Sequence, residues 1–203
     1  MKCRKAAGSD GIPVEVYKTD DPLLVDHLLA IFEKVWHEQV VPADLKNSTI
    51  VNIFKNKGDR ATCGNYRGIS LLSIAGKILS RVLLNRLLPV AETFLPESQC
   101  GFRPGRGTTD MIFAARQLQE KAREHNQEIH MVFIDLTKAF DSVNRDALWL
   151  VMEKAGCPPK FLEVVRQLHT GMQGRVSNEG SASDAFPIRT GVKQGCLLAP
   201  ILF

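Results

Sequence analysis

The sequence lacks the features that mark membrane, secreted and zinc-binding proteins. No uninterrupted apolar run approaches the roughly 18 residues that a transmembrane helix needs. No apolar stretch follows the basic residues at the N-terminus, as one would in a secretory signal. The five cysteines are scattered and odd in number, with no C-x-x-C pair and no histidine at metal-ligand spacing. We therefore expect an intracellular protein, cytoplasmic or nuclear and not secreted, with reduced thiols and no structural zinc.

Repeats and low-complexity tracts are also missing, and the 44% hydrophobic and 24% charged residues are typical of a globular protein. Helical spacing of apolar residues and the position of capping residues indicate where the elements lie, with Ser73 and either Thr108 or Thr109 as helix caps. These patterns predict helices over 22–38, 74–92, 108–124, 146–155 and 160–172, strands over 48–54 and 129–135, a hairpin over 173–192, and a helix that begins within 196–203.

Positive charge is concentrated in one part of the sequence. Residues 46–106 carry ten lysines and arginines against three acids, an excess of seven, whereas residues 108–203 carry eleven of each sign. A confined basic segment is what contact with a nucleic acid or a polyphosphate requires. A solvated helix face beside a basic loop explains the same pattern equally well.

The stretch VFIDLTKAFDSV, residues 132–143, runs from apolar residues into a carboxylate, Asp135. If residues 129–135 form a strand buried on both faces, Asp135 is held rigidly at its tip, a suitable place for a catalytic group. A carboxylate that merely caps the following turn is the alternative. A haloacid-dehalogenase-like phosphatase needs a second Asp where this chain has Thr137, and a receiver domain needs regular strand–helix alternation. A P-loop is excluded because no lysine precedes Thr108.

Five segments, in order, carry a specific resemblance. FIDLTKAFDSV resembles motif A of reverse transcriptases, and KAAGSDGIP resembles the K-A-P-G-x-D-G-I segment that opens the fingers in non-LTR (LINE-type) retrotransposon enzymes. IVNIFKNKGD with NYRGISLLSIAGKILSRVLLNRL resembles the next fingers motif, and QCGFRPGRGTTD the block before motif A. GVKQGCLLAPILF resembles motif B, whose core is Q-G-x-x-x-S-P. The resemblance covers nearly the whole chain.

The resemblance implies an α+β fold, the right-hand polymerase fold, with reverse-transcriptase-like fingers over residues 1–107 and a partial palm over 108–203. Motif A occupies 132–143 and motif B 191–203 of that palm. Motif C, an aromatic-Ala-Asp-Asp hairpin, and the thumb would follow Phe203, so we expect a domain cut at both ends, with some apolar surface exposed.

The implied activity is RNA-directed DNA polymerisation, with an RNA template, a DNA primer and dNTPs as partners and two Mg²⁺ ions as cofactors. Hard cations need oxygen ligands. By similarity, Asp135 is the catalytic carboxylate and a ligand of both ions, and the backbone oxygen of Leu136 is a second ligand. With one carboxylate of three present, we expect no polymerisation by this chain alone. A catalytically dead nucleic-acid-binding remnant of a mobile element is the alternative function.

Several residues match positions that bind the nucleotide in the family. Lys55 and Arg67 would clamp the triphosphate, with Lys57 as a weaker candidate, and the backbone N–H groups of 137–140 would cradle the same phosphates. Phe140 matches the steric gate that excludes a 2′-hydroxyl, with an ordinary core phenylalanine as the alternative.

The remaining candidates lie in motif B and in the glycine-rich loop before motif A. Gln194 and Gly195 would pack against the incoming nucleotide and the template base. Arg103 and Arg106 would contact template phosphates, with a solvated surface charge as the alternative for each. Asp141, close behind motif A's first carboxylate, is interpreted as a turn cap.

Overall fold

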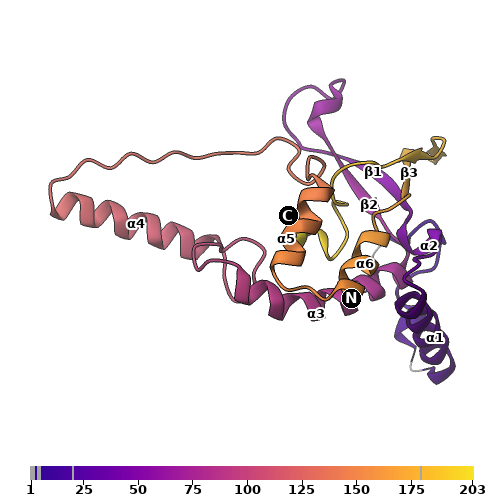
Figure 1. The fold of residues 1–203 in the computed structure, drawn as a ribbon. Helices are drawn as coiled ribbons and strands as arrows, with labels where there is room; N and C mark the ends of the chain where they lie inside the picture. The colour runs from indigo at the N-terminus through magenta and orange to yellow at the C-terminus, as the bar shows by residue number, and fades with distance from the viewer. Residues whose placement is uncertain (1–2, 4–5, 20, 179) are drawn as a thin grey trace.

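A computed structural model describes residues 3, 6–19, 21–178 and 180–203, and combines helices with one sheet, as expected for an α+β protein (Figure 1). The helices are α1 (Pro22–Glu38), α2 (Ala43–Lys46), α3 (Ile74–Phe94), α4 (Thr108–Glu124), α5 (Arg145–Lys154), α6 (Pro159–Gln167) and α7 (Ala199–Leu202). The strands are β1 (Ser48–Phe54), β2 (Tyr66–Leu71), β3 (Gln173–Asn178), β4 (Ser181–Ala182) and β5 (Phe186–Pro187). Within the described ranges, no helix is long and apolar enough to cross a membrane.

The sheet joins segments from both halves of the chain. Its strand order is β2-β1-β3-β4, and β5 also pairs with β3. β1 and β2 form an antiparallel hairpin, whereas β1 and β3 run parallel with Ser48 opposite Gly174. A parallel pair needs a long connection, and here that connection includes α3, α4, α5 and α6. The N-terminal hairpin is therefore fixed to a strand that comes much later in the sequence.

One hydrophobic core also spans both halves. Apolar side chains of α3 recur every four residues and face α1, α5 and α6. Val165 of α6 and Leu198 near the C-terminus are fully buried. The core residues, taken together, are Val35, Val41, Leu45, Leu79, Leu83, Leu87, Trp149, Met152, Cys157, Phe161, Leu162, Val164, Val165, Leu168, Val192, Leu198, Ala199 and Leu202.

The first elements agree closely with the sequence prediction. α1 and β1 have the predicted bounds, and α3 begins where the Ser73 cap predicts. The Ser73 hydroxyl accepts a hydrogen bond from the Gly76 amide at 3.1 Å, and so satisfies one of the free N–H groups of the helix terminus. These elements depend on local signals, and the predictions are confirmed.

Helix α4 has the predicted bounds but a different cap. Thr108 is already helical and Gly107 is the cap residue, so the prediction of a threonine cap is wrong. The Asp110 carboxylate instead accepts a hydrogen bond from the Gly107 amide at 2.7 Å. The helix projects from the body as an arm (Figure 1), and none of its residues is buried.

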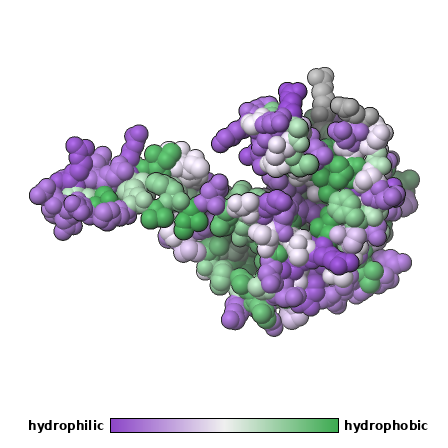
Figure 2. All heavy atoms as spheres, turned by 90° about the horizontal axis from the view of Figure 1, so that it is seen from above, coloured by the Kyte–Doolittle hydropathy of each residue, from purple (hydrophilic) through white to green (hydrophobic). Residues whose placement is uncertain are grey.

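The predicted buried strand over 129–135 is wrong in this structure. The segment is extended but has no strand pairing, and it returns alongside the α4 arm toward the body (Figure 1). Val132, Phe133 and Ile134 are 83%, 88% and 81% exposed. A strand is stable only with a neighbour that takes its backbone hydrogen bonds, and none of the described strands runs beside it. Hydrophobic residues are also visible at the surface of the projecting arm in Figure 2.

The C-terminal elements agree in part. α6 ends at Gln167 and not at 172, and the chain continues as a turn to Gly171, which has a positive φ of 64°. β3 and β4 form the predicted hairpin around Gly180, although residues 183–192 are irregular apart from β5. α7 is the helix predicted near the C-terminus.

Candidate functional site

Two basic side chains lie on one face of the β1–β2 hairpin. Ile53 pairs directly with Arg67, and the Lys55 amide donates to the Asn65 carbonyl at 2.8 Å, which extends the pairing past β1. Since Lys55 follows Ile53 by two positions, Lys55 and Arg67 point to the same side. The Lys55 ammonium donates to the Gly64 carbonyl at 2.8 Å. The Arg67 residue is exposed, and its side chain makes no hydrogen bond within the described residues.

The segment 191–195 lies against β2 through its backbone. The Ser70 amide donates to the Gln194 carbonyl at 2.8 Å. Gly195 has a φ of 119°, and a Cβ on it would lie 2.4 Å from the Ser70 carbonyl oxygen. This close approach requires glycine. Gln194 and Gly195 are therefore fixed beside the strand that carries Arg67.

The same segment is bound to the turn that follows motif A. The Val192 amide donates to the Phe140 carbonyl at 2.8 Å, and the Gly191 amide donates to the Val143 carbonyl at 3.0 Å. Gly191 has a φ of 75°, and a Cβ there would lie 2.6 Å from the Asp141 Cα. Through residues 191–195 the structure thus connects three of the predicted residues, Phe140, Gln194 and Gly195, to β2.

The Phe140 ring is half-buried in a small aromatic cluster. It packs edge-on against Phe102 with ring centroids 6.0 Å apart, and in a tilted arrangement against Phe203 with ring centroids 5.1 Å apart. Phe102 belongs to the glycine-rich loop before α4, so this loop helps to fix the ring. Both the steric-gate interpretation and that of a packed core residue are compatible with this position.

The residues around the Asp135 carboxylate are exposed and have few hydrogen-bond partners within the described chain. Asp135 is exposed and forms no hydrogen bond or ion pair with the described residues, and Leu136 is 60% exposed. The amides of 137–140 also donate to no acceptor in the described part of the chain. The Asp141 carboxylate makes no capping bond, and Asn144 caps α5 by accepting from the Ala147 amide at 3.0 Å. The interpretation of Asp141 as a turn cap is therefore wrong.

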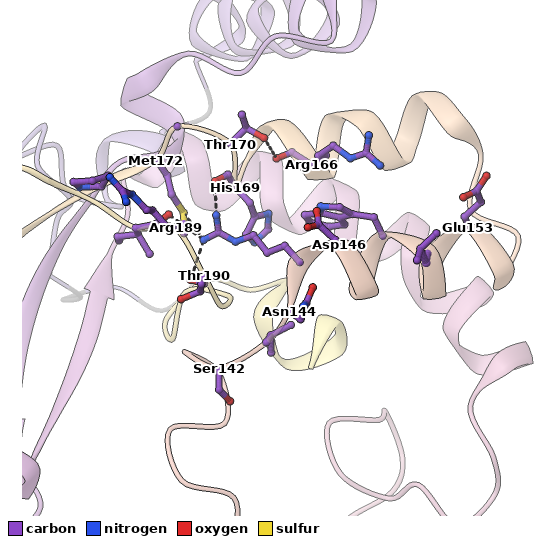
Figure 3. A pocket seen from close by; sticks show the side chains of 17 residues that line it. Ser142, Asn144, Asp146, Glu153, Arg166, His169, Thr170, Met172, Arg189 and Thr190 are labelled. Atoms are coloured by element: carbon purple, nitrogen blue, oxygen red, sulfur yellow. Dashed lines mark hydrogen bonds between the residues drawn. The ribbon is translucent and has the colours of Figure 1, made fainter.

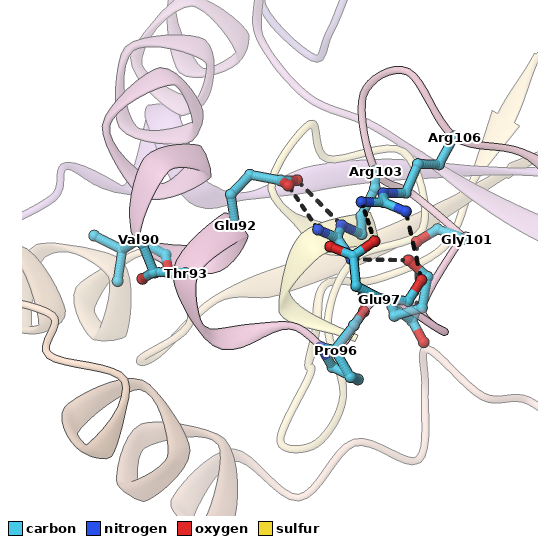
Figure 4. Close-up of polar contacts among 9 residues, drawn as sticks. Val90, Glu92, Thr93, Pro96, Glu97, Gly101, Arg103 and Arg106 are labelled. Atoms are coloured by element: carbon cyan, nitrogen blue, oxygen red, sulfur yellow. Dashed lines mark hydrogen bonds and ion pairs between the residues drawn. The ribbon is translucent and has the colours of Figure 1, made fainter.

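Arg103 and Arg106 are held by acidic partners (Figure 4). The Arg103 side chain is 2% exposed and pairs with Glu92 of α3 at 2.7 Å between Nη2 and Oε2. Its Nη1 donates to the carbonyls of Pro96 and Gln99. Arg106 pairs with Glu97 at 2.6 Å and keeps a 32% exposed side chain. Template contact stays a prediction for both, and the geometry of Arg103 favours an anchor for the loop.

Sequence reasoning missed two cations that bind backbone carbonyls, the partly buried Arg145 and the buried Lys193. Arg145 binds carbonyls that include those of His169 and Thr190 (Figure 3 draws these two bonds), and Lys193 binds that of Lys46. A signal existed for each. Arg145 is the first residue of α5, where the helix dipole disfavours a cation. Lys193 is the only charged residue in the largely apolar and small-residue run 190–203.

Residues 53–203, well over half of the chain, match the family described as reverse transcriptase (RNA-dependent DNA polymerase). The chain belongs to the reverse transcriptase family. The matched range includes the turn around Phe140, residues 191–195 that bind to it, and the β1–β2 hairpin from Ile53 onward.

The relatives of this reverse transcriptase domain come from non-LTR retrotransposons. The RNA-directed DNA polymerase from mobile element jockey of Drosophila melanogaster is 31% identical over 100% of this chain and 22% of that protein. The probable RNA-directed DNA polymerase from transposon X-element of the same species is 25% identical over 98% and 22%. The Pol polyprotein from type-1 retrotransposable element R2 of Bradysia coprophila is 28% identical over 98% and 22%. The chain spans about a fifth of the length of these curated relatives.

Reverse transcriptases use divalent metal ions, so the question for this reverse transcriptase domain is which of its residues could bind such an ion. No three His, Cys, Asp or Glu side chains gather in a metal-binding arrangement anywhere in the described ranges. Asp135 and the Leu136 carbonyl are hard oxygen donors of the right kind, but a two-ion site takes further carboxylates. The described residues therefore do not fit a complete Mg²⁺ site.

Proposed function

We propose that this chain is the part of a non-LTR retrotransposon RNA-directed DNA polymerase that binds the incoming dNTP opposite its template. The observation that supports this is the double attachment of residues 191–195. One end of the segment binds the turn at Phe140 and the other binds β2 at Ser70. A nucleotide seated over Gln194 and Gly195 would meet the motif A turn on one side and the basic hairpin face on the other.

The roles follow from charge and shape. Lys55 and Arg67 bind the triphosphate from the hairpin, together with the unpaired amides of 137–140. Phe140 contacts the sugar and disfavours a 2′-hydroxyl by steric clash. Gln194 and Gly195 pack on the base pair that forms.

For the nucleic acids, Arg106 is the stronger candidate for a template phosphate contact, since its side chain reaches the surface. We retain Arg103 as a weaker one. The partners in this proposal are an RNA template and a DNA primer, within the cell. Asp135 and the Leu136 carbonyl contribute part of the donor set for Mg²⁺.

Nucleic-acid binding without polymerisation is the second candidate function. One specific observation favours it, namely that no cluster of metal-binding side chains exists among the described residues. The two candidates agree on nucleotide and template binding and differ only in bond formation, so one experiment with two measurements separates them.

The test uses the 203-residue chain with an RNA template annealed to a DNA primer, and 5-iodo-dUTP as a photo-crosslinking nucleotide. We expect a saturable crosslink to peptides that contain Phe140 or Gln194. Arg67→Ala should weaken nucleotide binding about tenfold, the usual scale for a lost charge-assisted contact. Lys154→Ala, which removes an exposed cation from α5, is the matched control and should leave binding unchanged.

Crosslinks confined to other peptides, or equal binding by wild type and Arg67→Ala, would contradict the nucleotide site. Primer extension is measured in the same mixtures with Mg²⁺ and dNTPs. Extension that Asp135→Asn abolishes would support the polymerase and refute our expectation of an inactive chain. Crosslinking without extension would support the second candidate.

A further inference from the structure

Arg145 binds four backbone carbonyls and has no carboxylate partner among the residues that the structure describes. Its Nε donates to the Gly191 carbonyl at 2.9 Å, and its Nη2 donates to those of Thr190 at 3.0 Å and Ile188 at 3.2 Å. Its Nη1 donates to the His169 carbonyl at 3.0 Å. The planar fork of one guanidinium therefore links the chain just past α6 to residues 188–191, which lead directly into Gln194.

The location of these carbonyls explains why a cation is stable there. His169 follows the C-terminal end of α6, where carbonyls lack helical partners and the helix dipole is negative. Burial lowers the pKa of Arg145 from its ordinary value, but an arginine stays protonated inside proteins. A positive charge that is partly withdrawn from water needs polar partners, and here four carbonyl dipoles face the guanidinium.

Lys193 makes an equivalent connection from inside the same segment. Its side chain is buried, and its ammonium donates to the Lys46 carbonyl and to the Leu168 carbonyl, the latter at 3.4 Å. Lys46 is the last residue of α2, and Leu168 is the C-terminal cap residue of α6. The ammonium thus lies where the C-terminal ends of two helices meet. Two cations therefore bind residues 188–193 to the end of α6: Arg145, which comes from α5, and Lys193, which belongs to the segment itself.

We infer that Arg145 and Lys193 are positioning residues that fix residues 188–193 to the end of α6 and so align Gln194 and Gly195 with the Phe140 turn. The inference rests on the proposed function, because alignment matters only if residues 194–195 contact a nucleotide. The hydrogen bonds that report this alignment are those from the Gly191 and Val192 amides to the Val143 and Phe140 carbonyls.

The first measurement is amide hydrogen exchange at Gly191 and Val192, which needs no nucleotide. Arg145→Met and Lys193→Met should each raise exchange at these amides by roughly tenfold or more, the scale expected when hydrogen bonds to a charged group are lost. Exchange at the paired amides of β1 should stay as in wild type. Arg189→Met is the matched control, since Arg189 lies in the same segment, is exposed and bonds to no described residue.

Arg145→Lys is the milder variant and guards against a protein that fails to fold. A lysine keeps the charge but, as a point donor, cannot reach four carbonyls in a fork. We therefore expect raised exchange at Gly191 and Val192, while the thermal unfolding midpoint of the protein stays near that of wild type. Unchanged exchange at these two amides in folded Arg145→Lys and Lys193→Met would overturn the inference, as would an equal rise across the whole chain.

The second measurement is 5-iodo-dUTP binding by the same variants. Positioning predicts a loss of nucleotide affinity of roughly tenfold while RNA binding is kept, and Arg189→Met should bind like wild type. If wild type itself binds no nucleotide, the proposed function fails, yet the exchange data still decide whether the two cations fix the segment. Raised exchange with unchanged nucleotide affinity would overturn the claim that they align residues 194–195.

Discussion

Arg103 and Glu92 form a two-pronged ion pair that ties the loop after α3 back onto that helix. Nε lies 3.2 Å from Oε1 and Nη2 lies 2.7 Å from Oε2. The pair raises the pKa of Arg103 and lowers that of Glu92, chiefly through the hydrogen bond between them. Because Phe102 of this loop packs on Phe140, the ion pair also supports the turn that follows motif A.

A loop anchor and a template contact predict different effects of Arg103→Lys. We expect a lower thermal unfolding midpoint, since a lysine cannot bind Glu92 and two carbonyls together, and Glu92→Gln should lower it as well. The salt dependence of RNA binding should not change. A slope of log affinity against log salt that falls by about one, with the unfolding midpoint preserved, would assign Arg103 to the template.

Gly191→Ala should destabilise the protein more than an alanine at another glycine of similar φ. Gly191 and Gly105 have φ values of 75° and 71°, but only a Cβ at Gly191 would meet neighbouring backbone, at 2.6 Å. We expect a loss of about 2–3 kcal/mol in the free energy of unfolding at Gly191 and about 1 kcal/mol at Gly105. Urea denaturation of both variants measures this, and equal losses would contradict the docking of residues 191–192 on the turn.

Phe133→Ala should leave stability within about 0.5 kcal/mol of wild type, because the side chain is 88% exposed. Phe161→Ala is the comparison. That ring is 6% exposed in the core, and its loss should cost about 3–5 kcal/mol. Urea denaturation again provides the values. Similar losses for the two variants would mean that residues 129–135 pack as the buried strand that the sequence predicts.

Acid should weaken the fold through His169. Its ring is buried against Trp149 with Nδ1 2.9 Å from the Val165 carbonyl. Burial, helped by the positive charges of the nearby Lys193 and Arg145, lowers its pKa to about 4. In the unfolded chain the ordinary value near 6.5 returns, so the unfolded state binds the proton first as pH falls. Stability from this group is complete above pH 6.5 and decreases toward pH 4.

The expected slope is up to about 1.4 kcal/mol per pH unit from this one proton. Urea midpoints at several pH values measure it. His169→Gln should flatten the dependence between pH 6.5 and 4, whereas His125→Gln, at an exposed histidine, should not. Parallel profiles for wild type and His169→Gln would show that another group causes the acid sensitivity.

What could be predicted from the sequence follows the range of the interactions involved. The Ser73 cap and the bounds of α1 depend on neighbours within one helical turn, and both predictions are confirmed. The segment 129–135 has the composition of a strand, but a strand also needs a partner, and no local pattern shows whether one is present. The predicted strand is wrong for that reason.

The same limit applies to the charged residues. Lys55 and Arg67 share a face because strand alternation is local, so their juxtaposition was predictable once the hairpin was recognised. The partner of Arg103 is eleven residues away on another element, and the carbonyls around Arg145 come from residues 24 to 46 positions later. Burial of such side chains is a property of the tertiary fold.

The parallel pairing of β1 with β3 also constrains when this protein can fold. Gln173 donates its amide to the Asn47 side chain across a separation of 126 residues, and β3 continues from there along β1. β2 ends at Leu71 and β3 begins at Gln173, so at about 5–20 residues per second of synthesis the β1–β2 hairpin would wait roughly 5 to 20 s on the ribosome before β3 begins to be made. During that interval the hairpin is an isolated pair of strands with an unpaired edge, and such a pair is only marginally stable in water. The rate of folding is then set by closure of the very long loop between β1 and β3.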